Sequence, residues 1–216
     1  MALGELMDKA VGRVLVGAHN APQQERSKLK LRRLLDATCE ILVEGGVEAV
    51  TTTSVAARAG VSTGWLYNYF EGREALLEEI FVEGLRNLDR RLEAIDFSLA
   101  GPDWRAKAEA GIDAHIDFFS ELVWFRQVWF SSEFSGRIIQ ANRIHDNELA
   151  AHLASTITDV RPDAPDTPLE IMAIFFIGML DKGVDLAFRD DPLKGNPAIL
   201  QEMKRSCVGY LATFLP

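Results

Sequence analysis

The chain has 216 residues, of which 48% are hydrophobic, and its formal net charge at pH 7 is −9. This length allows one large domain or two small ones, and the apolar content is ample for buried cores. A protein this acidic is excluded as a general coat for nucleic acid, so any contact with DNA must come from a local patch. The first third is nearly neutral, whereas the remainder is strongly acidic.

The number of cysteines and the length of the apolar runs indicate in which cellular compartment the protein is expected. Two cysteines far apart in sequence, Cys39 and Cys207, give no disulfide framework and suit a reducing cytoplasm. The N-terminus does not resemble a signal peptide. The longest apolar run, 171–180, is about half of the roughly 20 residues that a membrane span needs. We therefore expect a cytoplasmic protein with no membrane association.

Helical periodicity is nearly continuous along the chain and strand-like alternation is almost absent, which predicts an all-α fold. Residues 1–26 form an extension with only a weak helical pattern, and the first firm helix runs from about 27 to 44, where Gly45-Gly46 ends it. Two short helices are expected next, one through Ala59 and one between Ser62 and Gly72. Longer or further helices are expected at about 73–95, 103–121, 123–132, 136–158, 168–189 and 197–214.

The spacing of small residues in 51–70 predicts a helix-turn-helix. Ala56 is small enough for two helices to cross closely, and Gly60, four residues later, suits the tight turn between them. Thr51 or Thr52 can cap the first helix and Ser62 the second. Leu66 and the aromatic pair Tyr69 and Phe70 then fall on the buried face. The start of the second helix is left free to enter a major groove.

These residues resemble the DNA-binding domain of the TetR family of transcriptional repressors. The resemblance is carried by Glu44-Gly-Gly-Val-Glu-Ala-Val-Thr51, by Val55-Ala-Ala-Arg-Ala-Gly-Val-Ser62, by Leu66-Tyr-Asn-Tyr-Phe70 and by Arg73-Glu-Ala-Leu76. It implies a three-helix DNA-binding domain at 27–72 and a helical ligand-binding and dimerisation domain at 73–216. It also implies DNA-contacting roles for Lys28, Thr52, Thr53, Ser62, Thr63, Gly64, Trp65, Tyr67, Asn68 and Arg73.

Two departures from the family pattern affect the DNA surface. Trp65 is bulkier than the small residue often found there, so it can pack on a thymine methyl or a sugar, or block some sequences. Arg73 replaces the usual lysine and can bind the same phosphate. Positive charge must come mainly from Arg26, Lys28, Lys30, Arg32 and Arg33, which either contact phosphate or form a solvated helix start.

The second two-thirds of the chain contain no catalytic signature, Walker loop or Rossmann glycine pattern, so no enzyme activity and no cofactor are predicted. The four histidines are scattered, and His145 and His152 are about 10 Å apart along a helix, too far to share one metal easily. The acidic stripe at Asp113, Asp117 and Glu121 is interpreted as a solvated face.

A cluster of aromatic residues between 104 and 134, with Phe175-Phe176 later, suggests either an ordinary core or the lining of a cavity for an apolar or aromatic ligand. The family resemblance implies such a pocket. The residues expected to line it are His115, Phe119, Trp124, Trp129, Asn142, Met172 and Phe176. His115 shares a face with Ile112 and Ile116, so a core histidine is the alternative.

The last two predicted helices carry more apolar surface than a surface helix needs, which indicates a partner. The resemblance implies a homodimer that pairs these helices and reads a palindromic operator in double-stranded DNA. The expected function is a ligand-responsive regulator, a repressor that a small effector releases. The alternative is a DNA-binding adaptor whose aromatic region binds a protein. An all-α enzyme would need a reactive constellation that the sequence lacks.

Overall fold

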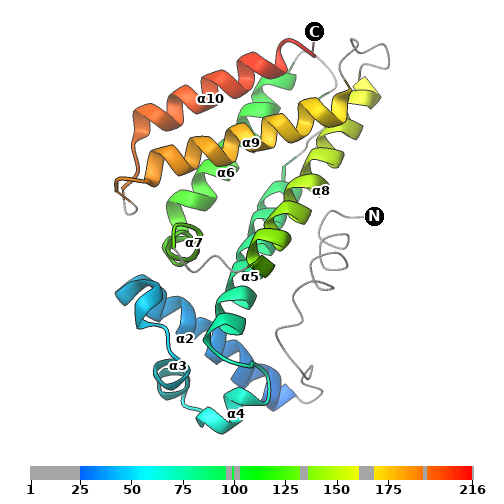
Figure 1. Ribbon diagram of the computed structural model, residues 1–216. Helices are drawn as coiled ribbons and strands as arrows, with labels where there is room; N and C mark the ends of the chain where they lie inside the picture. Colours follow the sequence, from blue (N-terminus) through cyan, green and yellow to red (C-terminus); the bar gives the residue numbers. More distant parts are fainter. Residues whose placement is uncertain are drawn as a thin grey trace. The chain divides into compact units, whose positions relative to one another are not determined.

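The computed structural model describes residues 25–95, 99, 103–131, 136–160, 168–191 and 194–215. Helices make up nearly all of these residues (Figure 1). The predicted 1–26 extension lies almost entirely outside the described part. No helix in the described ranges is both long and apolar enough to cross a membrane. The described residues fall into two compact units that are interleaved along the chain.

The first unit contains described residues 25–85, 122–131 and 136–141. It begins with α2 (Glu25–Ala49), whose backbone leaves the helical conformation at Gly46, where φ is 68°. The helices α3 (Thr52–Ala59), α4 (Thr63–Tyr67) and the start of α5 (Arg73–Glu93) follow, and α7 (Val123–Trp129) packs against α2. The helical backbone is thus interrupted at the predicted glycine pair. A φ of +68° favours glycine there, because it would strain any residue with a Cβ.

The core of this unit joins α5 to α7 through aromatic rings. Phe81 and Phe125 are fully buried and their ring centroids lie 5.1 Å apart. Gly84 gives Phe125 room, since a Cβ at position 84 would lie 2.0 Å from the Phe125 ring. The α5–α7 contact therefore depends on a glycine at this place in the helix.

The second unit contains described residues 86–95, 99, 103–121 and 142–215 with their gaps. It holds the end of α5, α6 (Trp104–Glu121), most of α8 (Gly136–Val160), α9 (Leu169–Phe188) and α10 (Pro197–Leu211). The last two helices lie side by side (Figure 1). Gly183 lets them approach, because a Cβ there would lie 2.1 Å from the Met203 sulfur.

The all-α fold and the order of helices predicted from the sequence are confirmed. The main difference is at helix ends: the helix predicted at 123–132 ends at Trp129, and the last one ends at Leu211. The two compact units do not follow the predicted boundaries at 26/27 and 72/73. These boundaries stay predictions, because compactness alone does not show which segments fold independently.

Candidate nucleic-acid interface and effector site

The turn between α3 and α4 is fixed by three local devices. Thr51 caps α3 in a reciprocal capping box with Ser54. Gly60 ends α3 in the left-handed conformation, with φ at 67°. Ser62 then caps α4 by accepting a hydrogen bond from the Trp65 backbone N–H at 3.1 Å. The sequence allowed Thr51 or Thr52 as the first cap, and the structure selects Thr51.

The inner face of this pair of helices is apolar and buried, as the spacing predicts. Val55, Ala56, Leu66 and Phe70 are at most 1% exposed, and Tyr69 is also buried. Ala56 accepts the backbone hydrogen bond of Val61 across the turn at 3.0 Å. A larger side chain at position 56 would push α4 away from α3, so the small residue sets how α4 is presented.

The opposite face of α4 is open to solvent. The residues exposed there or at the start of α3 are Thr53, Ser62, Thr63, Gly64, Tyr67 and Asn68. Tyr67 is 52% exposed, and its hydroxyl lies 3.3 Å from the hydroxyl of half-buried Thr52. Hydroxyl, amide and backbone N–H groups on one exposed helix face can donate to phosphates and base edges. The structure therefore brings most of the predicted DNA residues to one surface.

Trp65 is half-buried rather than fully exposed. Its ring packs on Tyr69 with centroids 4.6 Å apart, and the Lys30 ammonium lies 5.7 Å above it. This cation–π contact connects α4 to Lys30 of α2, one of the basic residues that were predicted to supply positive charge for DNA. Lys30 and its neighbours Arg26, Arg32 and Arg33 are exposed, whereas the side chain of Lys28 lies outside the described part.

Arg73 has a structural task that the sequence did not reveal. Its guanidinium donates to the backbone carbonyls of Val50 at 2.8 Å and Val47 at 3.0 Å. These bonds hold the short segment that follows Gly46 and precedes the Thr51 cap. The predicted contact between Arg73 and a DNA phosphate stays a prediction. The same guanidinium would have to bind the phosphate and the two backbone carbonyls together.

The predicted effector residues lie in both compact units. His115, Phe119, Asn142, Met172 and Phe176 belong to the second unit, and all except Asn142 are buried. The two tryptophans, Trp124 and Trp129, are half-buried and belong to the first unit, where Trp129 stacks on Phe81 at 6.0 Å. The structure places His115 against Phe119, with ring centroids 5.2 Å apart. The pocket itself stays a prediction.

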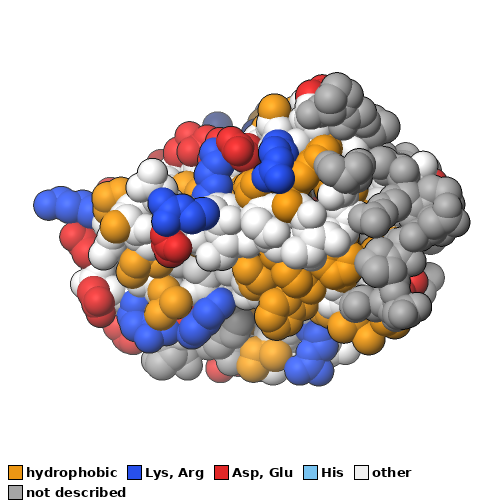
Figure 2. Space-filling view, turned by 90° about the horizontal axis from the view of Figure 1, so that it is seen from above, with side chains coloured by type: hydrophobic (Ala, Val, Ile, Leu, Met, Phe, Trp, Pro, Cys, Tyr) orange, Lys and Arg blue, Asp and Glu red, His pale blue; other side chains and the backbone are white. Residues whose placement is uncertain are grey.

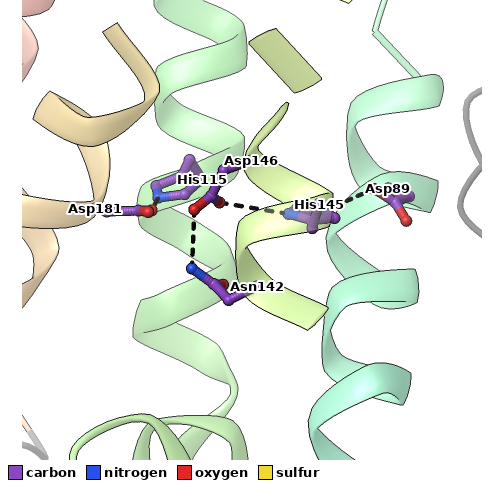
Figure 3. Close-up of polar contacts among 6 residues, drawn as sticks. All are labelled: Asp89, His115, Asn142, His145, Asp146 and Asp181. Carbon is purple, nitrogen blue, oxygen red and sulfur yellow. Dashed lines mark hydrogen bonds and ion pairs between the residues drawn. The ribbon is translucent and has the colours of Figure 1, made fainter. Parts of the chain in front are cut away.

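A buried polar cluster occupies the second unit, drawn from four helices (Figure 3). His145 on α8 lies 2.9 Å from the Asp89 carboxylate on α5, and 3.9 Å from Asp146. Asn142 donates to Asp146 at 2.9 Å. On the other side, His115 on α6 faces Asp181 on α9 at 3.7 Å. We call Asp89, His115, Asn142, His145, Asp146 and Asp181 the polar cluster.

Burial and charge push the pKa values in the polar cluster in different directions. Burial alone lowers the pKa of His145, but the carboxylates of Asp146 and Asp89 outweigh it and raise the pKa to about 9. Burial, with the nearby His145 charge, lowers the pKa of His115 to about 3. Burial and then the Asp146 charge raise the pKa of Asp181 to about 8. At neutral pH His145 is therefore a cation and His115 is neutral.

The sequence did not reveal this cluster, although it singled out His115 and Asn142. The histidines looked scattered because spacing within one helix says nothing about pairs made between helices. The available signal was weak: a histidine and an aspartate, His145-Asp146, adjoin each other in the middle of a helix. No group of side chains in the described ranges is arranged to hold a metal ion.

The capped turn, the buried crossing at Ala56 and the exposed polar face of α4 define a helix-turn-helix DNA-binding protein. Family models support this assignment over both parts of the chain. Residues 34–80 match the N-terminal domain of the bacterial regulatory proteins of the TetR family, and residues 103–211 match a tetracyclin repressor-like C-terminal domain. The chain belongs to the TetR family of transcriptional regulators.

Individual relatives are distant. The HTH-type transcriptional regulator BetI of Vibrio campbellii is 25% identical over 136 residues, which cover 61% of this chain and 68% of that protein. The HTH-type transcriptional repressor KstR of Mycobacterium tuberculosis is 33% identical over 103 residues, so the match spans about half of each chain, 48% and 47%. A TetR-family regulator from Streptomyces coelicolor superposes with a TM-score of 0.61 at 25% identity, covering 86% of this chain and 97% of that one.

Proposed function

We propose that this protein is a repressor that reads a palindromic operator as a homodimer and is released by a small apolar or aromatic effector. The observation that carries the proposal is the exposed polar face of α4, with Tyr67 and Asn68 open to solvent on a helix whose other side is buried. A helix anchored in this way can enter a major groove without unfolding its own core. The similarity to KstR, a named repressor, supports repression as the direction of control.

The homodimer is supported by an unpartnered apolar face on α9. Ile171 and Phe175 are each 59% exposed and Ile174 is also exposed, while Gly178 has open space beside it. Figure 2, seen from above, shows hydrophobic side chains gathered in a patch on this face. Phe175 contacts Tyr210 of α10 at 5.5 Å, so both helices contribute to this surface. A two-fold axis here would pair each helix with its copy.

Burial of the aromatic residues favours a small-molecule effector over a protein partner. Phe118, Phe119 and Phe125 are at most 1% exposed and Trp104 is buried. An adaptor would need these rings on an open surface, where a partner protein could cover them. Rings that face inward instead offer an apolar interior to a small ligand that enters the protein.

The first test is DNA binding by fluorescence anisotropy, with DNA that flanks the gene, scrambled DNA and an unbiased site selection. Selective binding that weakens with salt is expected, since phosphate contacts release counterions. Tyr67→Ala should weaken operator binding by about 1–2 kcal/mol, the order of one hydrogen bond to a charged phosphate. Asn68→Ala should also weaken operator binding, and its matched control Asn147→Ala, at an exposed asparagine of α8, should leave binding unchanged.

Trp65→Ala tests sequence reading separately from affinity. Loss of the indole also frees Lys30 from its ring contact, so the selected consensus should change more than the overall affinity does. The same consensus for the wild type and the Trp65 variant would contradict the proposed role of this residue. Failure to select any site would contradict operator recognition itself.

A further inference from the structure

His115 and Asp181 face each other without making a hydrogen bond. The His115 Nε2 and Asp181 Oδ1 atoms are 3.7 Å apart, beyond hydrogen-bond distance (Figure 3). The His115 side chain is only 6% exposed, and its Nε2 atom has no hydrogen-bond partner. A buried polar atom of this kind has lost its hydration without gaining a protein partner. The His115 Nε2 atom therefore faces a position where another group can form a hydrogen bond with it.

The geometry of this gap suits a single donor nitrogen. One nitrogen placed about 2.9 Å from each of two acceptors can bridge atoms that lie 3.7 Å apart. His115 accepts at Nε2 when its proton lies on Nδ1, which the neutral imidazole permits. Asp181 accepts through its carboxylate once it has released the proton that its raised pKa retains near pH 7. The bridging group must therefore carry at least two N–H bonds that diverge toward the two helices α6 and α9.

The charge balance of the polar cluster favours a cation in this gap. The cluster holds three carboxyl groups, those of Asp89, Asp146 and Asp181, but His145 is its only protonated imidazole. His145 is already hydrogen-bonded to Asp89. Among the described residues, Asp181 has no ion-pair partner within 4.0 Å other than neutral His115. Once Asp181 is ionised, an added positive charge offsets the resulting excess of carboxylates, whereas an added carboxylate would increase it.

Partly exposed carboxyl groups and an aromatic ring lie next to the gap. The Asp181 and Asp146 side chains keep 22% and 20% of their surface accessible, although Asp89 keeps only 1%. Solvent therefore reaches part of the Asp181 and Asp146 side chains, while the His145–Asp89 pair is closed. The Phe119 ring, 5.2 Å from the His115 ring, can contact the carbon part of a ligand whose nitrogen occupies the gap.

We propose that the effector of this regulator carries a primary ammonium group, which binds between His115 and Asp181 and places its carbon skeleton against Phe119. The inference rests on the proposed function and refines it, since the effector keeps an apolar or aromatic carbon skeleton and gains a charged head group. A primary ammonium has three donors, for His115, Asp181 and one further acceptor of the cluster. A quaternary ammonium has the charge but no N–H bond, so it cannot bridge the two atoms.

Four probes of equal chain length test this chemistry: n-butylammonium, butyltrimethylammonium, butan-1-ol and butanoate. At tenfold excess over its dissociation constant, n-butylammonium should raise the melting temperature of the wild type by roughly 3–6 °C. The other three should bind at least tenfold more weakly. Asp181→Asn, which keeps the shape of the side chain, should lower n-butylammonium affinity at least tenfold. Asp117→Asn, an exposed aspartate of α6, is the matched control and should have no effect.

Proton release gives a readout that a purely structural role of Asp181 would not produce. Binding of a cation stabilises the ionised carboxylate, so near pH 7 the complex should release protons because the pKa of free Asp181 is raised. Calorimetric titrations in buffers of different ionisation enthalpy measure this release. The wild type should release protons on binding n-butylammonium, and Asp181→Asn should release none from this position.

Three outcomes would overturn the inference: no binding of n-butylammonium, equal binding of the quaternary or neutral probe, or full binding by Asp181→Asn. Operator binding by the same preparations separates this failure from failure of the proposed function. If DNA binding is intact and the amine does not bind, only the effector chemistry is wrong. If the amine binds as expected but leaves operator affinity unchanged, the ammonium site is supported, and the proposed release of the protein from DNA by its effector is wrong.

Discussion

Replacing His145 by glutamine removes the protonated imidazole that lies between two carboxylates of the polar cluster. In the wild type His145 is 2.9 Å from Asp89 and 3.9 Å from Asp146, and Asp89 is only 1% exposed. Glutamine can occupy much of the same space and donate one hydrogen bond, but it carries no charge. The variant therefore leaves a buried carboxylate without its cation, which costs stability.

The size and pH dependence of this loss follow from the pKa of His145. Folding raises it from 6.5 to about 9, and each pKa unit corresponds to about 1.4 kcal/mol. Because the folded-state pKa is the higher one, the stabilisation is complete below about pH 6.5 and is lost as the pH rises through 9. Linkage gives about 3 kcal/mol at pH 6, about 2–3 kcal/mol at pH 7 and less than about 1 kcal/mol at pH 9.

Denaturant unfolding followed by circular dichroism at pH 6, 7 and 9 measures this difference. The free energy of unfolding of His145→Gln should approach that of the wild type as the pH rises, and the gap should close by about 3 kcal/mol between pH 6 and pH 9. His152→Gln is the matched control, because His152 lies on the same helix with an exposed side chain. A gap that stays constant between pH 6 and pH 9, or a control that behaves like the variant, would refute the reasoning.

Three further substitutions test the elements that position the surfaces. Thr51→Ala removes the cap of α3 and should cost about 1 kcal/mol in the free energy of unfolding, whereas Thr51→Ser should keep most of the stability. Gly84→Ala places a methyl group against the Phe125 ring and should cost about 1–3 kcal/mol, so an unchanged melting temperature would contradict the packing described. Phe175→Glu should shift the protein toward monomer in analytical ultracentrifugation and weaken operator binding, while Ser120→Glu at an exposed position of α6 should not.

Much of the helix-turn-helix could be predicted because its rules are local. Thr51, Gly60 and Ser62 act on backbone groups within a few residues of themselves, so their roles can be read along the chain. The small residue at Ala56 and the apolar spacing through Leu66 and Phe70 obey helix periodicity in the same way. The roles of the exposed DNA residues came from family resemblance and still await measurement.

The sequence was less informative wherever side chains meet between helices. Asp113 and Glu121 are on a solvent-exposed face, as predicted, but the sequence did not show that Asp113 pairs with Lys204 at 2.7 Å and Glu121 with Arg91 at 2.8 Å. It assigned Arg73 to phosphate, which stays a prediction, and it did not reveal that the Arg73 guanidinium also donates to two backbone carbonyls. In each case the partner lies at least 23 positions away, beyond the reach of any periodicity.

By itself the sequence determined the all-α class, the helix order, the caps and the family, since these depend on local backbone preferences and on a compact motif. Only the tertiary structure decided that His115 from α6 meets Asp181 from α9, and that His145 from α8 becomes a buried cation beside Asp89 from α5. The physical reason is that ionisation states depend on burial and on charges within a few ångströms. Those neighbours are set by how helices pack, and helices distant in sequence meet only after the chain has folded.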